Sequence, residues 1–386
     1  MVNDGLRYGV AVRDLRIDFF RGLALFMILV DHVAADPISR FTFQRFGFSD
    51  AAEIFVFLSG VSCGIVYFHV LARRGWTGFM AAINRRTMLI YGYYVLSSIV
   101  IILLLQAASP LIKNAGAIDQ SFILLRDDPL SAIWSTIFLI SPPDLPGILV
   151  LYIVLTPIVI PLFLMGAARN AVLTLAASGF IWTISQIYSD LLPHLADHSY
   201  FNPLAWQFLF SIGMFIGIRY DFDWSELRST PIFGWLLVAA WVIVIGSFLY
   251  RISFFLSSEF QFNLDWFRIS GTTYAHMKEN LSVVRLLHFL SVALLVAAYV
   301  TSSNPIFRWP GAVTVTLTGR YSLEVFSISA ILSVVLNIVV VAYHPSVLEK
   351  LGLDGIATLL MALTAFALSE FRSRRKRAID PNMSSP

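Results

Sequence analysis

The chain has 386 residues, of which 58% are hydrophobic and only 13% are charged. A soluble domain carries about 25% charged residues, so this composition excludes an ordinary water-soluble protein and indicates a large lipid-facing surface. The net charge of +3 does not indicate nucleic-acid binding, because the basic residues lie in short loops beside apolar runs. The single cysteine, Cys63, excludes an intrachain disulfide and a cysteine-based metal cluster.

Apolar segments long enough to cross a membrane recur along the chain, since a spanning helix needs about 20 mainly apolar residues. We identify ten of them, at 17–35, 51–70, 86–107, 146–165, 171–189, 204–219, 232–250, 283–301, 319–342 and 353–371. Segment 130–140 is too short to span and indicates an interfacial or re-entrant helix. The sequence therefore predicts an all-α, polytopic transmembrane helix bundle, with residues 1–386 forming a single domain.

The distribution of lysine and arginine predicts the orientation of these segments, because cytoplasmic loops are enriched in both. With the N-terminus inside, the inner segments hold 16 such residues and the outer loops 8. This bias, and the even number of spans, predicts that both termini are cytosolic. Residues 1–16 then form a cytosolic N-terminal segment, and residues 372–386 a basic cytosolic tail.

The first predicted span contains four titratable residues, Asp18, Arg21, Asp31 and His32, although a charge at the bilayer centre costs about 2.5–3.5 kcal/mol. At 100° per residue, His32 lies about 20° from the direction of Arg21, and Asp18 shares this face. His32 lies about 16 Å further out than Arg21. This stripe is typical of a general base at His32, since histidine accepts a proton near neutral pH. The alternative is structural: Asp18 pairs with Arg21, and His32 caps the helix.

Asp50 and Glu53 open the second predicted span, at the outer end where His32 emerges. Their spacing fits a capping box with Asp50 as the N-cap. The functional alternative is that Asp31, Asp50 or Glu53 holds the His32 imidazole in its useful tautomer or orients an acceptor hydroxyl. The catalytic candidates are therefore His32 and these three carboxylates.

Arg285 and His288 lie one turn apart in the eighth predicted span, preceded by Lys278. They form either a satisfied core cluster or a site for an anionic acyl group. Arg285 has no acidic residue within the following turn, so we expect it to be the freest intramembrane cation outside the first span. An acyl carboxylate buried without a cation would cost several kcal/mol, so Arg285 is the expected partner of such a group.

The sixth predicted span opens with Asn202, Pro203, Trp206 and Gln207. Asn202 and Pro203 are typical signals of a helix start. Trp206 and Gln207 can alternatively stack on a sugar and hydrogen-bond to it, so Asn202, Trp206 and Gln207 are acceptor-site candidates.

Two further pairs have helical spacing. Arg320 and Glu324, at i and i+4, predict a structural ion pair at the inner end of the ninth span. His194 and His198 have a spacing that can bind zinc, but they follow Pro193 in an outer loop, and we expect no metal site.

Several of the segments described above resemble the OpgC family of osmoregulated periplasmic glucan succinyltransferases, which is related to the type 3 membrane acyltransferases. Arg21 and His32 are similar to the arginine–histidine signature of that broader group, and Phe55–Gly60 is similar to its Phe-rich Ser-Gly segment. The resemblance covers most of the chain, in the blocks Arg13–Gly22, Asp31-His32, Phe41-Thr42, Asp50–Glu53, Ser59-Gly60, Asn202–Gln207, Leu286–Phe289 and Gly319–Glu324.

The resemblance implies that His32 is the catalytic histidine, that Arg21 serves the cytosolic donor, and that succinyl-CoA is this donor. We therefore expect an inner-membrane O-acyltransferase that moves a succinyl or other acyl group from cytosolic acyl-CoA to hydroxyls of a periplasmic glucan, without a permanently bound cofactor. Expected partners are acyl-CoA, the glucan and the bilayer, with glucan-synthesis proteins or further copies of the chain as additional ones. The expected donor-binding residues are Arg21, Asp18, Arg85, Arg86, Ser59 and Arg320.

The main alternative is a proton-coupled membrane transporter of glycans or small anions, because intramembrane Asp, Arg and His residues also form proton relays. No pair of broken helices and no inverted repeat is visible in the sequence, which argues against a transporter. A non-catalytic scaffold would leave the costly intramembrane charges unexplained.

Overall fold

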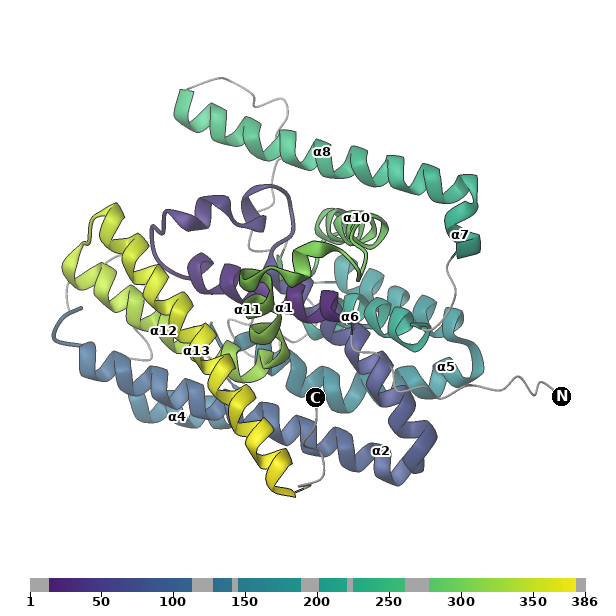
Figure 1. Cartoon of the computed structure of the whole chain (residues 1–386), viewed down its shortest axis with the longest axis horizontal. Coiled ribbons are helices and arrows are strands. Elements are labelled where there is room, and N and C mark those ends of the chain that lie inside the picture. Colours follow the sequence, from purple (N-terminus) through teal and green to yellow (C-terminus); the bar gives the residue numbers. More distant parts are fainter. Residues whose placement is uncertain are drawn as a thin grey trace.

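The computed structural model describes residues 14–112, 128–140, 145–188, 201–220, 225–260 and 278–379. Within these ranges the chain folds into helices without any strand, which confirms the all-α prediction (Figure 1). The α-helices are α1 (Leu15–Asp31), α2 (Ala51–Ala108), α4 (Pro129–Ile137), α5 (Gly147–Ile187), α6 (Pro203–Ile218), α7 (Ser225–Ser229), α8 (Pro231–Phe260), α10 (Val283–Tyr299), α11 (Pro310–Arg320), α12 (Ser322–Tyr343) and α13 (Val347–Ile379). Short 3-10 helices lie at η1 (Ile38–Phe41), η2 (Phe43–Arg45) and η4 (Pro305–Arg308).

Two of the long helices each combine two predicted spans, joined by a bend instead of a loop. In α2 the bend is at Gly75, whose φ is 64°. Glycine adopts a positive φ without the steric strain that other residues incur. In α5 the bend is Asn170, with φ −155° and ψ 104°. The Asn170 side chain accepts hydrogen bonds from the backbone N–H groups of Val172 and Leu173, each at 3.0 Å, and so caps the second half.

Apart from a few residues at the ends and the break at Tyr321, the described residues of every predicted span are helical. In the part of the chain that the structure describes, five helices, α2, α5, α8, α12 and α13, are long and apolar enough to cross a membrane by length and composition. The number of ten crossings remains a prediction. The predicted span 319–342 is interrupted, because α11 ends at Arg320 and α12 begins at Ser322, with Tyr321 at φ −108° and ψ 36° between them.

The short helix α4 lies where a non-spanning helix was predicted. The helix ends before Leu139, which has a positive φ of 60°. The rings of Trp134 and Phe138 are exposed and stack on one another, with their centroids 5.9 Å apart. Exposed aromatic rings are enriched at membrane interfaces, so this geometry agrees with an interfacial position.

Glycines set the closest helix contacts of the bundle. Gly60 and Gly64 of α2 face Gly213 and Gly217 of α6, and a Cβ added to Gly213 would lie 2.3 Å from the carbonyl oxygen of Phe57. The two backbones therefore touch, as in small-residue packing of membrane helices. This contact fixes the part of α2 that carries Ser59 and Cys63.

The helix α1 is held between several neighbours. A Cβ on Gly319 of α11 would lie 1.8 Å from the carbonyl oxygen of Asp18, so the backbones of α1 and α11 are also in contact. At the start of α1, Asp14 accepts hydrogen bonds from the Arg16 backbone at 2.9 Å and from the Tyr220 hydroxyl at 2.6 Å. Burial raises the pKa of Asp14, but the bonds from Arg16 and Tyr220 outweigh it and hold that pKa below its ordinary value.

The helix α8 lies at the edge of the molecule, where it packs mainly on α10 (Figure 1). Most of its apolar side chains are exposed, as expected for a helix surrounded by lipid.

Candidate active site

His32 is the residue immediately after α1 and caps its C-terminal end. Its Nδ1 lies 2.8 Å from the carbonyl oxygen of Ile28. Because a carbonyl oxygen can only accept a hydrogen bond, Nδ1 carries the proton in the neutral ring, and Nε2 keeps its lone pair. The residue as a whole is exposed.

The backbone around His32 is held by α12 and α13. The Asn337 side chain donates to the His32 carbonyl oxygen at 2.6 Å and accepts from the Ala34 N–H at 2.8 Å. Ala35, with a positive φ of 51°, has its carbonyl oxygen bound by the Lys350 ammonium at 3.1 Å. Sequence reasoning missed Asn337, although a lone amide in the apolar stretch of α12 is a signal that could have identified it.

Asp50 and Glu53 form the predicted capping box of α2. The Ala52 N–H donates to Asp50 at 2.8 Å, and the Asp50 N–H donates to Glu53 at 2.8 Å. Asp31 instead accepts a 2.6 Å bond from the Thr42 hydroxyl and so fixes the following loop.

The expectation that a carboxylate fixes the tautomer of His32 needs a correction. Among the described residues, the ring nitrogen bond of His32 goes to the Ile28 carbonyl and not to Asp31, Asp50 or Glu53. The physical reason is that the i−4 carbonyl at a helix end has no backbone donor and lies within reach of the ring.

The expectation that Arg285 is the freest cation was wrong. Its guanidinium is 0% exposed and lies 2.6 Å from the Glu53 carboxylate and 3.0 Å from Asp50. Lys278 binds the same Asp50 oxygen at 3.1 Å. Two cations and two carboxylates thus neutralise one another between α2 and α10, as burial of charge requires.

His288 anchors the loop that precedes α2. Its Nδ1 lies 2.6 Å from the Ser49 hydroxyl and accepts from the Ser49 N–H at 3.3 Å. Its ring contacts the rings of Phe43 and Phe48, and a Cβ on Gly47 would lie 2.0 Å from its Nε2. Of the two predicted roles for His288, this geometry supports the satisfied core residue.

The acceptor candidates on α6 are buried and satisfied inside the bundle. The Asn202 side chain caps α6 by accepting a hydrogen bond from the Leu204 N–H at 3.0 Å, as the helix-start signal in the sequence predicted. The Trp206 ring is 0% exposed, and its N–H donates to the backbone carbonyls of Lys278 and Glu279. The Gln207 amide binds Ser178. Asn202 and Trp206 thus support the segment that leads into α10, and Gln207 ties α6 to α5. In this arrangement the three residues do not present a surface for a sugar.

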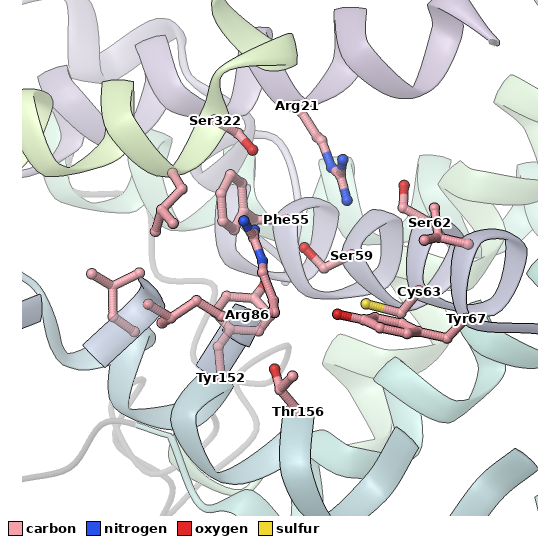
Figure 2. A pocket seen from close by; sticks show the side chains of 14 residues that line it. Arg21, Phe55, Ser59, Ser62, Cys63, Tyr67, Arg86, Tyr152, Thr156 and Ser322 are labelled. Atoms are coloured by element: carbon pink, nitrogen blue, oxygen red, sulfur yellow. The ribbon is translucent and has the colours of Figure 1, made fainter. Parts of the chain in front are cut away.

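A cavity of about 240 Å³ lies between α1, α2, α5 and α12 (Figure 2). Figure 2 shows Arg21 reaching into it from α1 and Arg86 from the second half of α2. No acidic residue belongs to the described side chains that line it. Its hydroxyl groups come from Ser59, Ser62, Tyr67, Tyr152, Thr156 and Ser322. Two cations and several hydroxyl donors make this cavity suited to an anionic, polar ligand.

Two polar groups at the cavity have unsatisfied hydrogen-bonding capacity. Arg21 donates to the Leu58 carbonyl at 2.9 Å, but its Nε is buried with no partner in the described part of the chain. The Tyr152 hydroxyl, in a residue only 6% exposed, also has no hydrogen bond of normal length in the described part of the chain, although the Ser59 side chain lies close to it. Buried polar groups are normally satisfied, so these atoms can bind a polar ligand in the cavity.

Of the six expected donor-binding residues, Arg21, Arg86 and Ser59 line the cavity. Asp18, Arg85 and Arg320 do not: Asp18 is buried against α11, and both arginines are exposed. Sequence reasoning missed the contributions of Tyr67, Tyr152, Thr156 and Ser322. The serine, cysteine and tyrosine side chains that follow Ser59 at helical spacing on α2 were the available signal.

The predicted Arg320–Glu324 ion pair is wrong. Glu324 instead binds Arg372 of α13. The helix breaks at Tyr321, so Arg320 and Glu324 lie on different helices and lose the i,i+4 geometry. The possible zinc pair at 194 and 198 lies outside the described residues.

Comparison with protein families finds one model, described as OpgC protein, that matches residues 13–373. Comparison with curated proteins and with solved structures finds no match. The matched region is nearly the whole chain and includes both the cavity and the His32 end of α1. The chain therefore belongs to the OpgC family.

Proposed function

We propose that this chain is a membrane O-acyltransferase that moves an acyl group, preferentially succinyl, from cytosolic acyl-CoA to hydroxyls of a periplasmic glucan. The observation that carries the proposal is the arrangement of α1. Arg21 lines a cationic cavity, and His32 presents an unprotonated Nε2 about 16 Å further along the same helix.

The cavity suits the donor in charge and in length. Arg21 and Arg86 match the phosphates of a CoA thioester, which arginine binds in a bidentate manner. The lining residues of α2 run from Phe55 to Tyr67, which corresponds to about 18 Å of helix. A pantetheine arm of about a dozen bonds of roughly 1.5 Å has a similar reach, so the thioester can approach the His32 end.

The chemistry then needs one base. Nε2 of His32 removes the proton from a glucan hydroxyl, whose oxygen attacks the thioester carbonyl carbon. The carbon–sulfur bond breaks as the ester forms, and the imidazolium returns its proton to the CoA thiolate. A positioned acid–base group of this kind is worth about 10²- to 10⁴-fold in rate.

The buried cluster of Arg285, Asp50, Glu53 and Lys278 has a supporting role in this proposal. It ties the start of α2 to the start of α10 and thereby fixes the loop that contacts Asp31. Since the Arg285 guanidinium already pairs with the Glu53 and Asp50 carboxylates, it is not assigned to the acyl group.

We also propose that the protein lies in the bacterial inner membrane with both termini cytosolic. The exposed arginines Arg73, Arg74, Arg85 and Arg86 flank the Gly75 bend, and this agrees with a bend on the cytosolic side.

The test uses purified full-length protein incubated with succinyl-CoA and a periplasmic glucan. We expect succinyl ester on the glucan together with an equal amount of CoA thiol, and acetyl-CoA should be used less well. A transporter produces neither product. Ester formation by wild-type protein that persists in a His32→Gln variant would remove His32 from the mechanism.

A further inference from the structure

The helix α12 begins on the wall of the cavity. Ser322, its first residue, lines the cavity, and no side chain caps the first turn. A helix N-terminus presents backbone N–H groups without intrahelical partners and about half a positive charge. Such ends bind phosphate groups.

The cavity supplies independent observations that indicate a ligand at this place. In the described part of the chain, neither the buried Tyr152 hydroxyl nor the buried Nε of Arg21 has a hydrogen-bond partner within bonding distance. Arg86 approaches the cavity from the other side (Figure 2). Three positive sources and an unsatisfied hydroxyl therefore converge on one space.

The acidic residue in the first turn of this helix is neutralised from outside the cavity. Glu324 lies in the first turn of α12, and its carboxylate binds Arg372 of α13. The Arg372 guanidinium also lies over the Tyr321 ring, 4.8 Å from its centroid. Arg372 belongs to the basic C-terminal tail, and its ion pair with Glu324 offsets the negative charge in this first turn.

We propose that the N-terminus of α12, with Arg21 and Arg86, forms a phosphate-binding site that receives a phosphate group of the CoA donor. This inference rests on the proposed function and names the part of the donor that enters at Ser322. The site acts through the charge of the helix end, and Arg372 positions it by holding the Glu324 carboxylate away from the anion.

The test measures binding and not turnover. Full-length protein in phosphatidylcholine nanodiscs is titrated calorimetrically with CoA and, separately, with pyrophosphate. We expect Ser322→Asp to weaken both ligands by about tenfold or more, because a carboxylate then occupies the helix end. Arg86→Gln should produce a similar loss, since it removes a charge-assisted bond.

Two matched variants serve as controls. Ser322→Asn has the same shape as Ser322→Asp without the charge, so it reports any steric effect and should lose clearly less affinity than Ser322→Asp. Arg74→Gln removes an exposed arginine next to the Gly75 bend that does not line the cavity, and it should bind normally. An acidic residue in a first helical turn does not destabilise the helix, so Ser322→Asp should retain the melting temperature.

The outcomes separate the possible explanations. Pyrophosphate affinity unchanged in Ser322→Asp, or reduced equally in Ser322→Asn, would overturn the site. Phosphatidylglycerol nanodiscs provide a second arm: if this lipid displaces CoA from wild type but not from Arg86→Gln, the phosphate belongs to a lipid headgroup and the donor assignment is overturned. If pyrophosphate and the variants behave as expected but no glucan ester forms, the site stands and the proposed function fails.

Discussion

The Nδ1 atom of His32 lies 2.8 Å from the carbonyl oxygen of Ile28, one helical turn earlier on α1. The backbone of its own helix therefore orients the proposed base. A carboxylate usually performs this task in catalytic triads and also stabilises the imidazolium. Here the ring orientation depends on how α1 ends, and Asn337 of α12 secures that end through the His32 carbonyl oxygen at 2.6 Å.

The first prediction concerns this base. His32→Gln should lower ester formation by about 10²- to 10⁴-fold, because glutamine cannot take a proton from the acceptor. His69 provides a matched control, since its Nδ1 makes the same contact with the Ile65 carbonyl, at 2.6 Å, but it lies on α2 and does not share a helix with Arg21. Neither histidine lines the cavity. His69→Gln should keep the wild-type rate. Equal losses in both variants would show that the ring–carbonyl contact serves folding and not catalysis.

The second prediction concerns Arg285. Arg285→Met should destabilise the protein by about 3–5 kcal/mol, because Glu53 and Asp50 then remain buried without this cation. Thermal unfolding in detergent measures the loss. Arg308→Met, at an exposed arginine, should have little effect.

The same variant tests the role in acyl choice that its sequence position suggested. We expect the ratio of succinyl to acetyl transfer to be unchanged in the protein that remains folded. Adding Glu53→Gln to Arg285→Met should recover part of the stability, because one uncompensated charge is removed. A stable Arg285→Met protein that selectively loses succinyl transfer would contradict this account.

Hydropathy predicts the helices well because a helix that faces lipid must be apolar along its length. It does not reveal how consecutive helices join. Gly75 and Asn170 each replace a whole loop by one residue with non-helical angles, and the hydrophobic pattern continues on both sides. Tyr321 has the opposite effect, because it breaks a pattern that reads as one span.

Only those parts of the site whose residues lie on the same helix could be predicted from the sequence. The 100° spacing along α1 connects Arg21 with His32, and the spacing of Asp50 and Glu53 gives the capping box. The partner of Arg285 was not predictable, because Glu53 lies 232 residues away in the sequence. Ser322 has no sequence signal of a ligand site, since its position depends on the break at Tyr321.

The third prediction concerns topology. In a Cys63→Ser background, Phe41→Cys should react with a membrane-impermeant maleimide in intact cells, and Arg374→Cys should react only after lysis. The two positions are equally accessible, with 77% exposure for Phe41 and 77% for the Arg374 side chain, so a difference in labelling reports the compartment. The reverse labelling pattern would invert the orientation.

The last prediction concerns the ion pair between Glu324 and Arg372. Arg372→Gln should weaken CoA binding by about 5- to 30-fold, because the Glu324 carboxylate is then uncompensated in the first turn of α12 and repels the donor phosphate. Glu324→Gln alone should bind CoA at least as well as wild type, since it removes the repelling charge.

The double variant decides between this role and direct contact of Arg372 with the donor. If Arg372 acts only by holding Glu324, the affinity of Glu324→Gln/Arg372→Gln should return to within about twofold of Glu324→Gln, a strongly non-additive result. If Arg372 binds the phosphate itself, the two effects should add, and the double variant should remain weak. Arg374→Gln is the control, because it breaks a 2.9 Å ion pair with Glu370 inside α13 and should leave CoA affinity unchanged. Weakening by Arg374→Gln equal to that by Arg372→Gln would mean that overall basic charge at the end of α13, and not the Glu324 contact, controls donor binding.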